Sequence, residues 1–423
     1  MEVSNTILSF REKKDYFIKK YIDEYQVISL RANIVGNNKC IKESYILLSY
    51  FDKLIDKYSI NKFVFDNDDG PCVIYLCSKD ECLKDKMVVL EEENTLGRFV
   101  DIDVYYNTRY SLSRKNLRKC YICDNPAFVC GRLGSHSVKE LNDYIINNTI
   151  SELVKIINSL SFESMIEELE LHPKFGLVTP YTNGSHLDMD YDLMVKAQKA
   201  IVPFFEKMFL TGYNNESINE TFGVVRKIGI NAEEEMFKVT KGVNAYKGLI
   251  FALGLVITSV SIKLSRLKSN DSCFDYIKIM TQGLSKEAEE SNDTTGKKAY
   301  QIYGLKGARH QAENGFKDAE HIINNYDLET EDSKLKALCE LIVNVDDTVL
   351  IKRCNSIEEY YDVKRMFRDL LNNKVSIDEL NDYCIFKGYS FGGCADLLII
   401  SLFIKKINKI FNFDLFRKIK ELE

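Results

Sequence analysis

The sequence reads Leu96-Gly97-Arg98-Phe99-Val100-Asp101-Ile102-Asp103-Val104 at the end of its first quarter, and from Val100 onward apolar and acidic residues alternate. Successive side chains of a β-strand point to opposite faces. Val100, Ile102 and Val104 would therefore be buried, while the two carboxylates would share the other face about 6–7 Å apart. This stretch predicts a strand that presents a pair of acidic groups.

The sequence around this strand predicts an α+β domain over residues 1–150. The segment 27–34 alternates in the same way, and the runs 63–65, 72–77 and 87–90 are further strand candidates. Between them, residues 41–55 carry apolar side chains at helical spacing. Mixed strand and helix patterns of this kind are typical of α+β folds.

The rest of the chain, residues 151–423, is predicted to be an all-α helical bundle. No proline follows Pro203, and apolar residues recur every three or four positions, as at Leu335, Leu338, Leu341 and Ile342. The boundary is expected near residues 137–160, in a helix that ends one domain or begins the next.

Composition restricts the classes of function. The chain has 423 residues and a formal net charge of −6, which argues against a general nucleic-acid binder. Its longest apolar stretch, Leu249–Val260, is shorter than the roughly 20 residues of a membrane span and predicts a buried helix. No secretory signal is visible, so we expect a cytoplasmic protein. Its 12 cysteines would then serve packing, metal or redox roles rather than disulfides.

Asp101 and Asp103 are candidate ligands for Mg²⁺. Carboxylate and phosphate oxygens together suit this ion, which neutralises a leaving diphosphate and orients the phosphorus for attack. Arg98 could add positive charge at a phosphate. The alternative is a solvated strand face, since D-x-D is a short and common pattern.

Cysteines and a histidine also cluster after the acidic strand. Cys120, Cys123, Cys130 and His136 could form a three-Cys, one-His zinc site. The spacing from Cys123 to Cys130 is shorter than in most zinc modules, and buried or incidental thiols are the alternative.

The second half contains polar motifs among its helices. If Glu233–Gly248 is one helix, Glu233, Thr240, Asn244 and Lys247 share a narrow face, as in a polar pocket within a bundle; an exposed helix face is the alternative, and Gly242 would break the helix. Gly392-Gly393 opens a predicted helix whose free backbone N–H groups could bind phosphate, although a simple loop fits too.

Residues 10–145 contain an ordered series of motifs: Arg11, Asn33-Ile34-x-Gly36-x-x-Lys39, Ser44, Gly97-Arg98-x-x-Asp101-Ile102-Asp103, Ser111-Leu112, Arg118-Lys119-Cys120-x-x-Cys123, Ala127-x-Val129-Cys130-x-Arg132 and His136. In this order they resemble the citrate lyase holo-acyl-carrier-protein synthase family. The resemblance implies attack by a serine of the apo acyl carrier subunit of citrate lyase on triphosphoribosyl-dephospho-coenzyme A, with diphosphate leaving. Arg98, Asp101 and Asp103 would be its catalytic residues. Val35 stands where the family usually has proline.

Residues 160–405 contain a second ordered series of motifs: Glu168, Pro173-Lys174-Phe175-Gly176-Leu177-Val178, Asn183-Gly184-Ser185-His186-x-Asp188-Met189-Asp190, Asn244 to Gly248, Gly304 to Arg309, Asp346 to Leu350 and Gly392 to Leu398. In this order they resemble the triphosphoribosyl-dephospho-coenzyme A synthase family. The resemblance implies that ATP and 3′-dephospho-coenzyme A are substrates, with the ribose 2′-hydroxyl displacing adenine.

The second resemblance also implies site residues, without one role for each. Its catalytic candidates are His186, Asp188, Glu233, Lys247 and Arg309. Its substrate-binding candidates are Lys174, Asn183, Thr240, Asn244, Asp346, Gly392, Gly393 and Asp396.

This half departs from the family pattern at several motif positions. Tyr246 stands where the family usually has histidine, and Gln311 where it has a carboxylate. The blocks Asp346–Cys354 and Ser390–Cys394 also differ. Losing an imidazole and a carboxylate could lower or abolish turnover.

Three hypotheses follow. The leading one is a bifunctional enzyme that makes the citrate lyase prosthetic group and attaches it to the carrier, without a nucleic-acid or membrane partner. The second keeps only the N-terminal transferase active, with the C-terminal half a nucleotide-binding or carrier-docking module. The third is a metal-stabilised scaffold without activity. A malonate decarboxylase carrier remains an alternative acceptor.

Overall fold

The computed structural model describes residues 2–107, 110–113, 117–290 and 295–417. The chain forms two compact units. The sheet unit extends to Lys155 and also includes Leu264–Asn270 and the described residues from Asn408 onward. The helical unit comprises Ile156–Lys263 and Asp271–Ile407.

The sheet unit contains four strands in the order β2-β3-β1-β4, all antiparallel. The strands are β1 (Gln26–Ala32), β2 (Ser59–Phe65), β3 (Cys72–Cys77) and β4 (Val100–Tyr105). Its helices and 3₁₀ turns are α1 (Glu2–Tyr21), α2 (Lys42–Ile55), η1 (Asp56–Tyr58), α3 (Leu83–Glu93), η2 (Gly97–Phe99), α4 (Ala127–Leu133) and the first part of α5 (Val138–Glu170). Strands were correctly predicted in four regions, as was the helix over 41–55.

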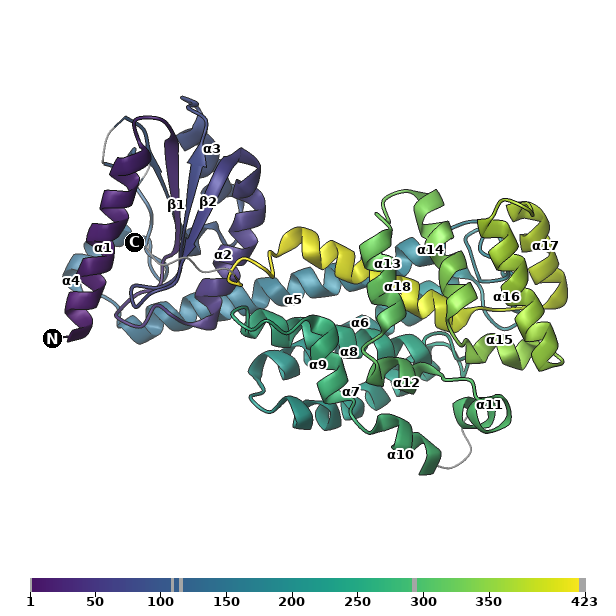
Figure 1. Ribbon diagram of the computed structural model, residues 1–423. Helices are drawn as coiled ribbons and strands as arrows, with labels where there is room; N and C mark the ends of the chain where they lie inside the picture. The colour runs from purple at the N-terminus through teal and green to yellow at the C-terminus, as the bar shows by residue number, and fades with distance from the viewer. Residues whose placement is uncertain (1, 108–109, 114–116, 291–294, 418–423) are drawn as a thin grey trace. The chain divides into compact units, whose positions relative to one another are not determined.

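Helices cover the two faces of the sheet differently (Figure 1). Phe10 and Ile18 of α1, with Ile22 just after this helix, pack against one face in a cluster that includes Val27 and Tyr105. Helices α2 and α3 contact the strands as well, and the alternate strand residues such as Ile28 and Leu30 are fully buried. The face under α1 is the one that carries Asp101 and Asp103, because Tyr105 lies two and four residues beyond them on β4.

One strand prediction was wrong. Residues 87–90 lie within α3, where Leu83, Met87 and Glu91 form the buried side at four-residue spacing. A four-residue apolar run fits a strand or one side of a helix equally well. Val89 is 47% exposed, so the run is not uniformly buried as a core strand would be.

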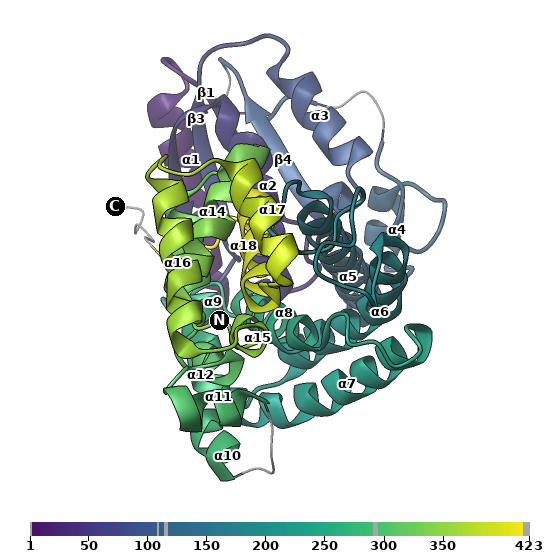
Figure 2. The same ribbon diagram turned by 90° about the vertical axis from the view of Figure 1, so that its right-hand side faces the viewer.

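The helical unit consists of the remainder of α5 and thirteen further helices in the part of the chain that the structure describes. They are α6 (Tyr191–Asn214), α7 (Ile218–Val239), α8 (Lys247–Ser265), α9 (Cys273–Met280), α10 (Leu284–Glu290), α11 (Thr295–Tyr303), α12 (Ala308–Glu313), α13 (Lys317–Asn325), α14 (Glu331–Asn344), α15 (Thr348–Arg353), α16 (Ile357–Leu371), α17 (Ile377–Lys387) and α18 (Gly392–Ile410). Figure 2 shows α14, α16, α17 and α18 as neighbours. Leu335, Leu338, Leu341 and Ile342 are buried in α14, as their spacing predicted.

Helix α8 is the apolar core helix that the sequence predicted. By length and composition it could cross a membrane, but 83% of its most apolar window is buried within the protein. Glycines bring α6 and α8 close together: a Cβ at Gly212 would lie 2.6 Å from the Thr258 carbonyl oxygen, and one at Gly254 would lie 2.5 Å from the Met208 sulfur. Close approach of the two helices therefore requires residues without side chains at these positions.

Candidate functional sites

The acidic strand places its two carboxylates in different environments. Asp101 is 53% exposed and lies opposite Arg31 of β1, whereas Asp103 is half-buried and lies opposite Ser29. Burial and the charge of Asp101 raise the pKa of Asp103. A nearby cation would stabilise the ionised form of both carboxylates, because two negative charges on one face repel each other.

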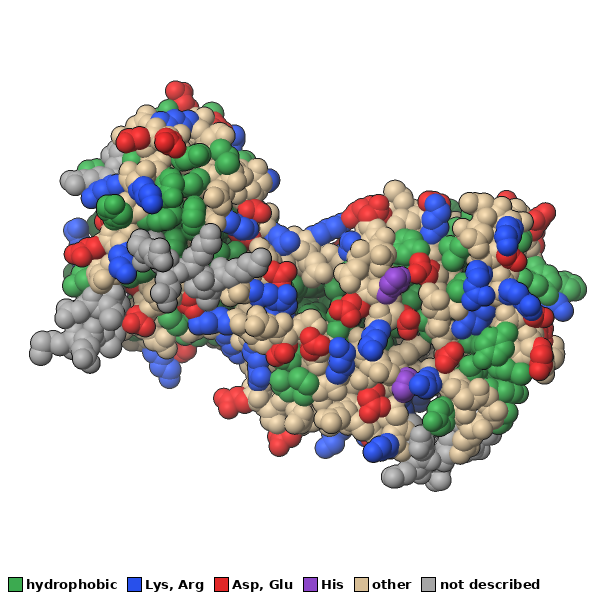
Figure 3. All heavy atoms as spheres, viewed as in Figure 1, with side chains coloured by type: hydrophobic (Ala, Val, Ile, Leu, Met, Phe, Trp, Pro, Cys, Tyr) green, Lys and Arg blue, Asp and Glu red, His purple; other side chains and the backbone are tan. Residues whose placement is uncertain are grey.

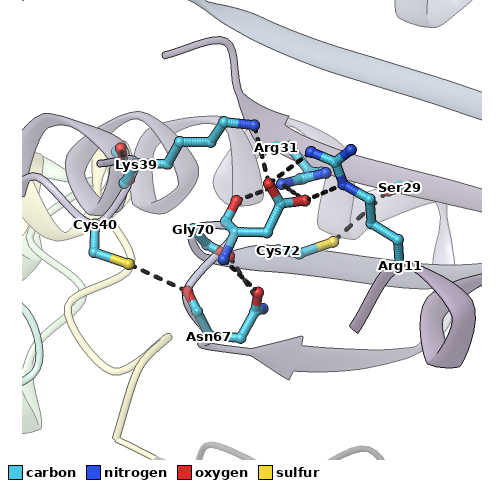
Figure 4. Close-up of polar contacts among 10 residues, drawn as sticks. Arg11, Ser29, Arg31, Lys39, Cys40, Asn67, Gly70 and Cys72 are labelled. Atoms are coloured by element: carbon cyan, nitrogen blue, oxygen red, sulfur yellow. Dashed lines mark hydrogen bonds and ion pairs between the residues drawn. The ribbon is translucent and has the colours of Figure 1, made fainter. Parts of the chain in front are cut away.

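A buried carboxylate draws three cationic side chains together beside this strand. Asp69 is 1% exposed, and Arg11 binds both of its oxygens at 3.0 Å. Arg31 contacts its Oδ2 at 2.7 Å and also donates to its carbonyl oxygen, while Lys39 contacts Oδ1 at 3.0 Å. Figure 4 shows these three side chains, from α1, β1 and the loop after β1, converging on one point.

The charge balance of this cluster favours anions. Burial alone would raise the pKa of Asp69, but hydrogen bonds from Arg11 and Lys39 and the charge of Arg31 outweigh burial and lower the pKa. Three cations facing one carboxylate leave an excess of positive charge. Because Arg31 lies opposite Asp101, this charge adjoins the acidic strand. Arginine and lysine in such an arrangement suit phosphate groups.

The structure gives Arg98 contacts away from the acidic pair. Its guanidinium donates to the carbonyl oxygens of Lys119 at 3.2 Å and Cys120 at 2.8 Å, and it lies over the ring of Tyr121. Arg118 is the arginine that reaches the strand, with Nη2 at 2.5 Å from Glu91 and 3.4 Å from Asp101. A role for Arg98 at a phosphate stays a prediction.

The predicted cysteine and histidine ligands come together. The ligand atoms of Cys120, Cys123, Cys130 and His136 all lie within 4.8 Å of one another. The sulfurs of Cys123 and Cys130 are 3.4 Å apart, and His136 Nε2 is 3.4 Å from the Cys123 sulfur. The cysteines are free thiols in the structure.

In the helical unit, Lys174 lies in a buried polar cluster. Its ammonium group contacts Glu168 Oε1 at 2.9 Å and the Glu168 carbonyl oxygen at 2.8 Å. Gln198 donates to the Tyr246 hydroxyl at 2.7 Å. Burial, then the charge of Glu168, raises the pKa of Tyr246 well above 10. Burial, then the charges of Asp347 and Glu168, likewise raises the pKa of Asp396.

His186, also in the helical unit, lies close to two polar side chains. Its Nε2 lies 3.0 Å from the buried Ser390 hydroxyl, and its Nδ1 lies 3.8 Å from Asp188. Burial and the charge of Arg353 lower its pKa, so the imidazole is neutral at pH 7. Asn183 is exposed and contributes its carbonyl oxygen to the turn that carries His186. A neutral imidazole can accept a proton from a substrate hydroxyl.

The Gly-Gly turn does open a helix, but a carboxylate occupies part of its N-terminus. Asp347 caps α15 and accepts a hydrogen bond from the backbone N–H of Cys394 at 3.0 Å. A Cβ at Gly393 would lie 3.2 Å from that carboxylate, whereas Gly392 has ordinary contacts. The neighbouring Asp346 accepts from the Lys306 N–H at 3.0 Å. Phosphate binding by Gly392 and Gly393 stays a prediction.

Glu233, Lys247 and Arg309 line one pocket formed by α7, α8, α10 and α12. Lys247 pairs with Glu233 at 2.7 Å. Arg226 pairs with Glu287 across the same pocket, through two contacts of 2.7 Å. The wall of this pocket therefore carries both acidic and basic groups. Charges of both signs are also interspersed on the face of the helical unit that Figure 3 shows.

The segment Glu233–Gly248 is not one continuous helix, and the break lies at Gly242, the residue named as a helix breaker. Helix α7 ends at Val239, Gly242 adopts a φ of +92°, and α8 begins at Lys247. Thr240 turns inward and donates to backbone carbonyls, and Asn244 accepts from the Lys247 N–H at 3.2 Å. A turn, rather than a shared helix face, brings Glu233 and Lys247 together.

Two known protein families match the chain, and the boundary between the two matches lies close to the boundary between the sheet unit and the helical unit. Residues 3–152 match the family CitX, apo-citrate lyase phosphoribosyl-dephospho-CoA transferase, and residues 155–414 match the family CitG, ATP:dephospho-CoA triphosphoribosyl transferase. The chain belongs to the CitG family and carries a CitX domain before it. It is accordingly a transferase.

Relatives with both domains span most of this CitX–CitG chain. Protein CitXG of Haemophilus influenzae is 32% identical over 354 residues, with 76% of each chain covered. Protein CitXG of Leuconostoc mesenteroides subsp. cremoris is 28% identical over 455 residues, covering 95% of this chain and 96% of the relative. The 2-(5''-triphosphoribosyl)-3'-dephosphocoenzyme-A synthase of Haemophilus ducreyi is 30% identical over 324 residues, covering 67% of this chain and 98% of its own length.

Sequence reasoning missed several polar residues of the CitX and CitG domains. Arg31 was detectable, because Ser29 and Arg31 alternate with apolar residues in β1 as the acidic pair does in β4. Asp69 lies in a polar turn, and the sequence around it does not predict that its side chain is buried. Gln198 and Ser390 acquire their contacts only through distant segments, at Tyr246 and His186.

Proposed function

We propose that the chain both makes and attaches the prosthetic group of citrate lyase. In the helical unit, the ribose 2′-hydroxyl oxygen of 3′-dephospho-coenzyme A bonds to the anomeric carbon of ATP. The bond from that carbon to adenine breaks, and adenine leaves with the electron pair and a proton. The product is 2′-(5″-triphosphoribosyl)-3′-dephospho-coenzyme A.

The sheet unit then carries out the transfer. A serine oxygen of the apo acyl carrier subunit bonds to the α-phosphorus of the triphosphate. The bond from that phosphorus to the bridging oxygen breaks, and diphosphate leaves with the electron pair while the serine proton passes to a base. The proposed partner is the citrate lyase carrier, and the substrates are cytoplasmic metabolites.

One observation carries the proposal for the sheet unit: the convergence of Arg11, Arg31 and Lys39 beside Asp101 and Asp103. The cations suit a triphosphate, and the paired carboxylates suit a Mg²⁺ bound to its oxygens. Such a metal would offset the burial and the repulsion from Asp101 that raise the pKa of Asp103. Stabilising the charge of the leaving diphosphate contributes a large part of the rate enhancement in this type of reaction.

In the helical unit, we assign proton transfer and charge stabilisation to different groups. Neutral His186, held by Ser390, is the proposed base for the ribose hydroxyl. Asp396, whose raised pKa keeps its proton to higher pH, is the proposed donor to departing adenine. Lys247 and Arg309 in the pocket are proposed to bind triphosphate oxygens.

Tyr246 and Gln311 favour a second candidate for the helical unit. A neutral buried tyrosine and an amide cannot supply the imidazole and carboxylate of the family pattern. With those groups absent, this unit could bind nucleotide or dock the carrier without turning over.

Two assays distinguish these functions. Adenine released from ATP, dephospho-coenzyme A and Mg²⁺ without carrier measures the synthase alone. Diphosphate released from purified triphosphoribosyl-dephospho-coenzyme A and apo-carrier measures the transferase alone. We expect both products. Diphosphate without adenine would support the binding-module alternative, and neither product would refute the proposed function.

A further inference from the structure

Four side chains in the sheet unit form a set suited to zinc. Zinc–sulfur bonds of about 2.3 Å and zinc–nitrogen bonds of about 2.0 Å put tetrahedral ligand atoms roughly 3.5–3.8 Å apart. The observed separations are 3.4 Å from Cys123 to Cys130, and 3.4 Å from Cys123 to His136. All four ligand atoms, including the Cys120 sulfur, fall within a 4.8 Å limit.

The backbone positions these ligands through local turns. The Cys120 N–H donates to the Asn125 carbonyl oxygen at 2.7 Å, which closes the turn that holds Cys120 and Cys123. Cys130 lies in α4, and Gly134 ends that helix with a left-handed φ of 58°. The chain then reverses and brings His136 back to the cysteines. The ligands therefore come from a turn, a helix and the loop after it.

Apart from Tyr121, whose ring contacts those of Phe99 and Tyr144, this segment has few apolar contacts to hold it in place. Ile122, Phe128 and Leu133 are 44%, 49% and 75% exposed. Cys120 and Cys130 are its buried side chains with apolar character. Small segments without an adequate hydrophobic core commonly depend on a metal or another crosslink. A bound metal would therefore add stability that apolar burial does not provide in this segment.

The segment also holds groups that reach the acidic strand. Arg118, two residues before Cys120, contacts Glu91 and Asp101. Arg98 binds the carbonyl oxygens of Lys119 and Cys120, and the Tyr121 hydroxyl donates to the Arg98 carbonyl oxygen at 2.9 Å. The position of the cysteine turn is thus coupled to η2 and to the start of β4.

We propose that Cys120, Cys123, Cys130 and His136 bind one structural Zn²⁺, which fixes Arg118 against Asp101. Four protein ligands close the coordination shell, so this zinc organises the site and takes no part in bond making. Arg118 is then a positioning residue for the acidic strand. The inference that zinc binds here rests on the ligand geometry alone. The inferred effect of zinc on carrier loading also rests on the proposed function of the sheet unit.

The test measures zinc in the purified full-length protein by mass spectrometry, with Cys123→Ser, His136→Ala and His136→Cys. Cys82→Ser, an exposed cysteine outside the cluster, is the control. We expect about one zinc per chain in the wild type and the control. We expect little zinc in Cys123→Ser and His136→Ala, and recovery in His136→Cys because thiolate is also a zinc ligand.

Cobalt substitution gives a readout that does not depend on activity or on the variants. Co²⁺ bound by three thiolates and an imidazole should produce strong thiolate charge-transfer bands. Absence of both zinc and these bands from the wild type, or equal metal loss in Cys82→Ser, would overturn the metal site.

Activity tests the positioning role separately. With zinc removed, carrier loading should fall at least tenfold while adenine release stays within about twofold, and His136→Cys should restore loading. Unchanged carrier loading in metal-free protein would overturn the positioning of Arg118 while leaving the zinc itself established.

Discussion

At the scale of residues, the sheet site depends on an imbalance of charge. Asp69 organises Arg11, Arg31 and Lys39 but neutralises only part of their charge. Asp101 and Asp103 lie on the adjoining strand, where burial and repulsion raise the pKa of Asp103. Positive and negative groups are therefore placed side by side without cancelling, and this arrangement would suit the proposed metal–triphosphate complex.

Asp101→Asn and Asp103→Asn should each lower carrier loading by at least a hundredfold and leave adenine release unchanged. Each substitution removes a charged metal ligand, while the synthase residues lie in the other unit. Mass analysis of the carrier and chromatography of adenine measure the two steps. Asp85→Asn, on the exposed side of α3, is the control. Normal loading by both variants would contradict the assignment.

Asp69→Asn should lower the free energy of unfolding of the sheet unit by about 2 kcal/mol at pH 7. Removing one partner of a buried pair costs about 3–5 kcal/mol, and partial exposure of the three cations reduces this. Because the folded-state pKa of Asp69 is lowered, its contribution is complete above the unfolded pKa near 4 and disappears as pH falls further.

Urea unfolding followed by circular dichroism at pH 7 and pH 3 measures this contribution. The deficit of Asp69→Asn should be smaller at pH 3 than at pH 7, and exposed Asp23→Asn should show no deficit. An equal deficit at both pH values would refute the electrostatic explanation.

The double variant Gln311→Glu with Tyr246→His should raise adenine release by about tenfold or more. It restores a carboxylate and an imidazole where the buried tyrosine, with its raised pKa, cannot exchange protons near pH 7. The single variants serve as controls. No adenine from either the natural or the double-variant protein, with dephospho-coenzyme A still bound, would favour the binding-module alternative.

At the scale of elements, the start of α8 is tightly constrained. A Cβ at Gly248 would lie 2.3 Å from Asp396 Oδ2, so α8 and α18 can approach here only without a side chain. The same segment carries Tyr246 and Lys247, which belong to the buried cluster and the pocket. The turn from α7 to α8 thus positions groups in both places.

Gly248→Ala should reduce adenine release at least tenfold, because the added methyl group displaces Asp396. Gly223→Ala, within α7, is the matched control: apart from adjacent residues and the local helix backbone, no atom would lie within 4 Å of its Cβ, and alanine should stabilise the helix by about 0.5–1 kcal/mol. Steady-state adenine release and thermal unfolding compare the two. Equal adenine release by Gly248→Ala and Gly223→Ala would contradict the prediction that the position of Asp396 beside Gly248 matters for activity.

The sequence predicted elements well where periodicity was sustained. Alternation identified β1 and β4, and three-to-four spacing identified α2 and α14. It failed where a run was short, as in α3. It left open whether the chain continues as a helix between α7 and α8, where Lys241 and Gly242 adopt positive φ and the chain turns. Local patterns do not determine such choices, because tertiary packing decides them.

At the scale of the whole molecule, the two units are not simply successive in sequence. The division falls within α5, and residues 264–270 and 408–417 return to the sheet unit. There, Asn412 donates to Asp52 at 2.7 Å, and the rings of Phe416 and Tyr45 are 5.0 Å apart. Such long-range contacts cannot be read from local patterns, and the same holds for Asp69 and Ser390.

The central claim is that one chain performs both steps. The most direct test is mass spectrometry of apo-carrier after incubation with this protein, ATP, dephospho-coenzyme A and Mg²⁺. The predicted result is carrier whose mass has increased by one phosphoribosyl-dephospho-coenzyme A group on a serine, with one adenine released per group. Carrier of unchanged mass, while purified triphosphoribosyl-dephospho-coenzyme A is still attached, would contradict the claim.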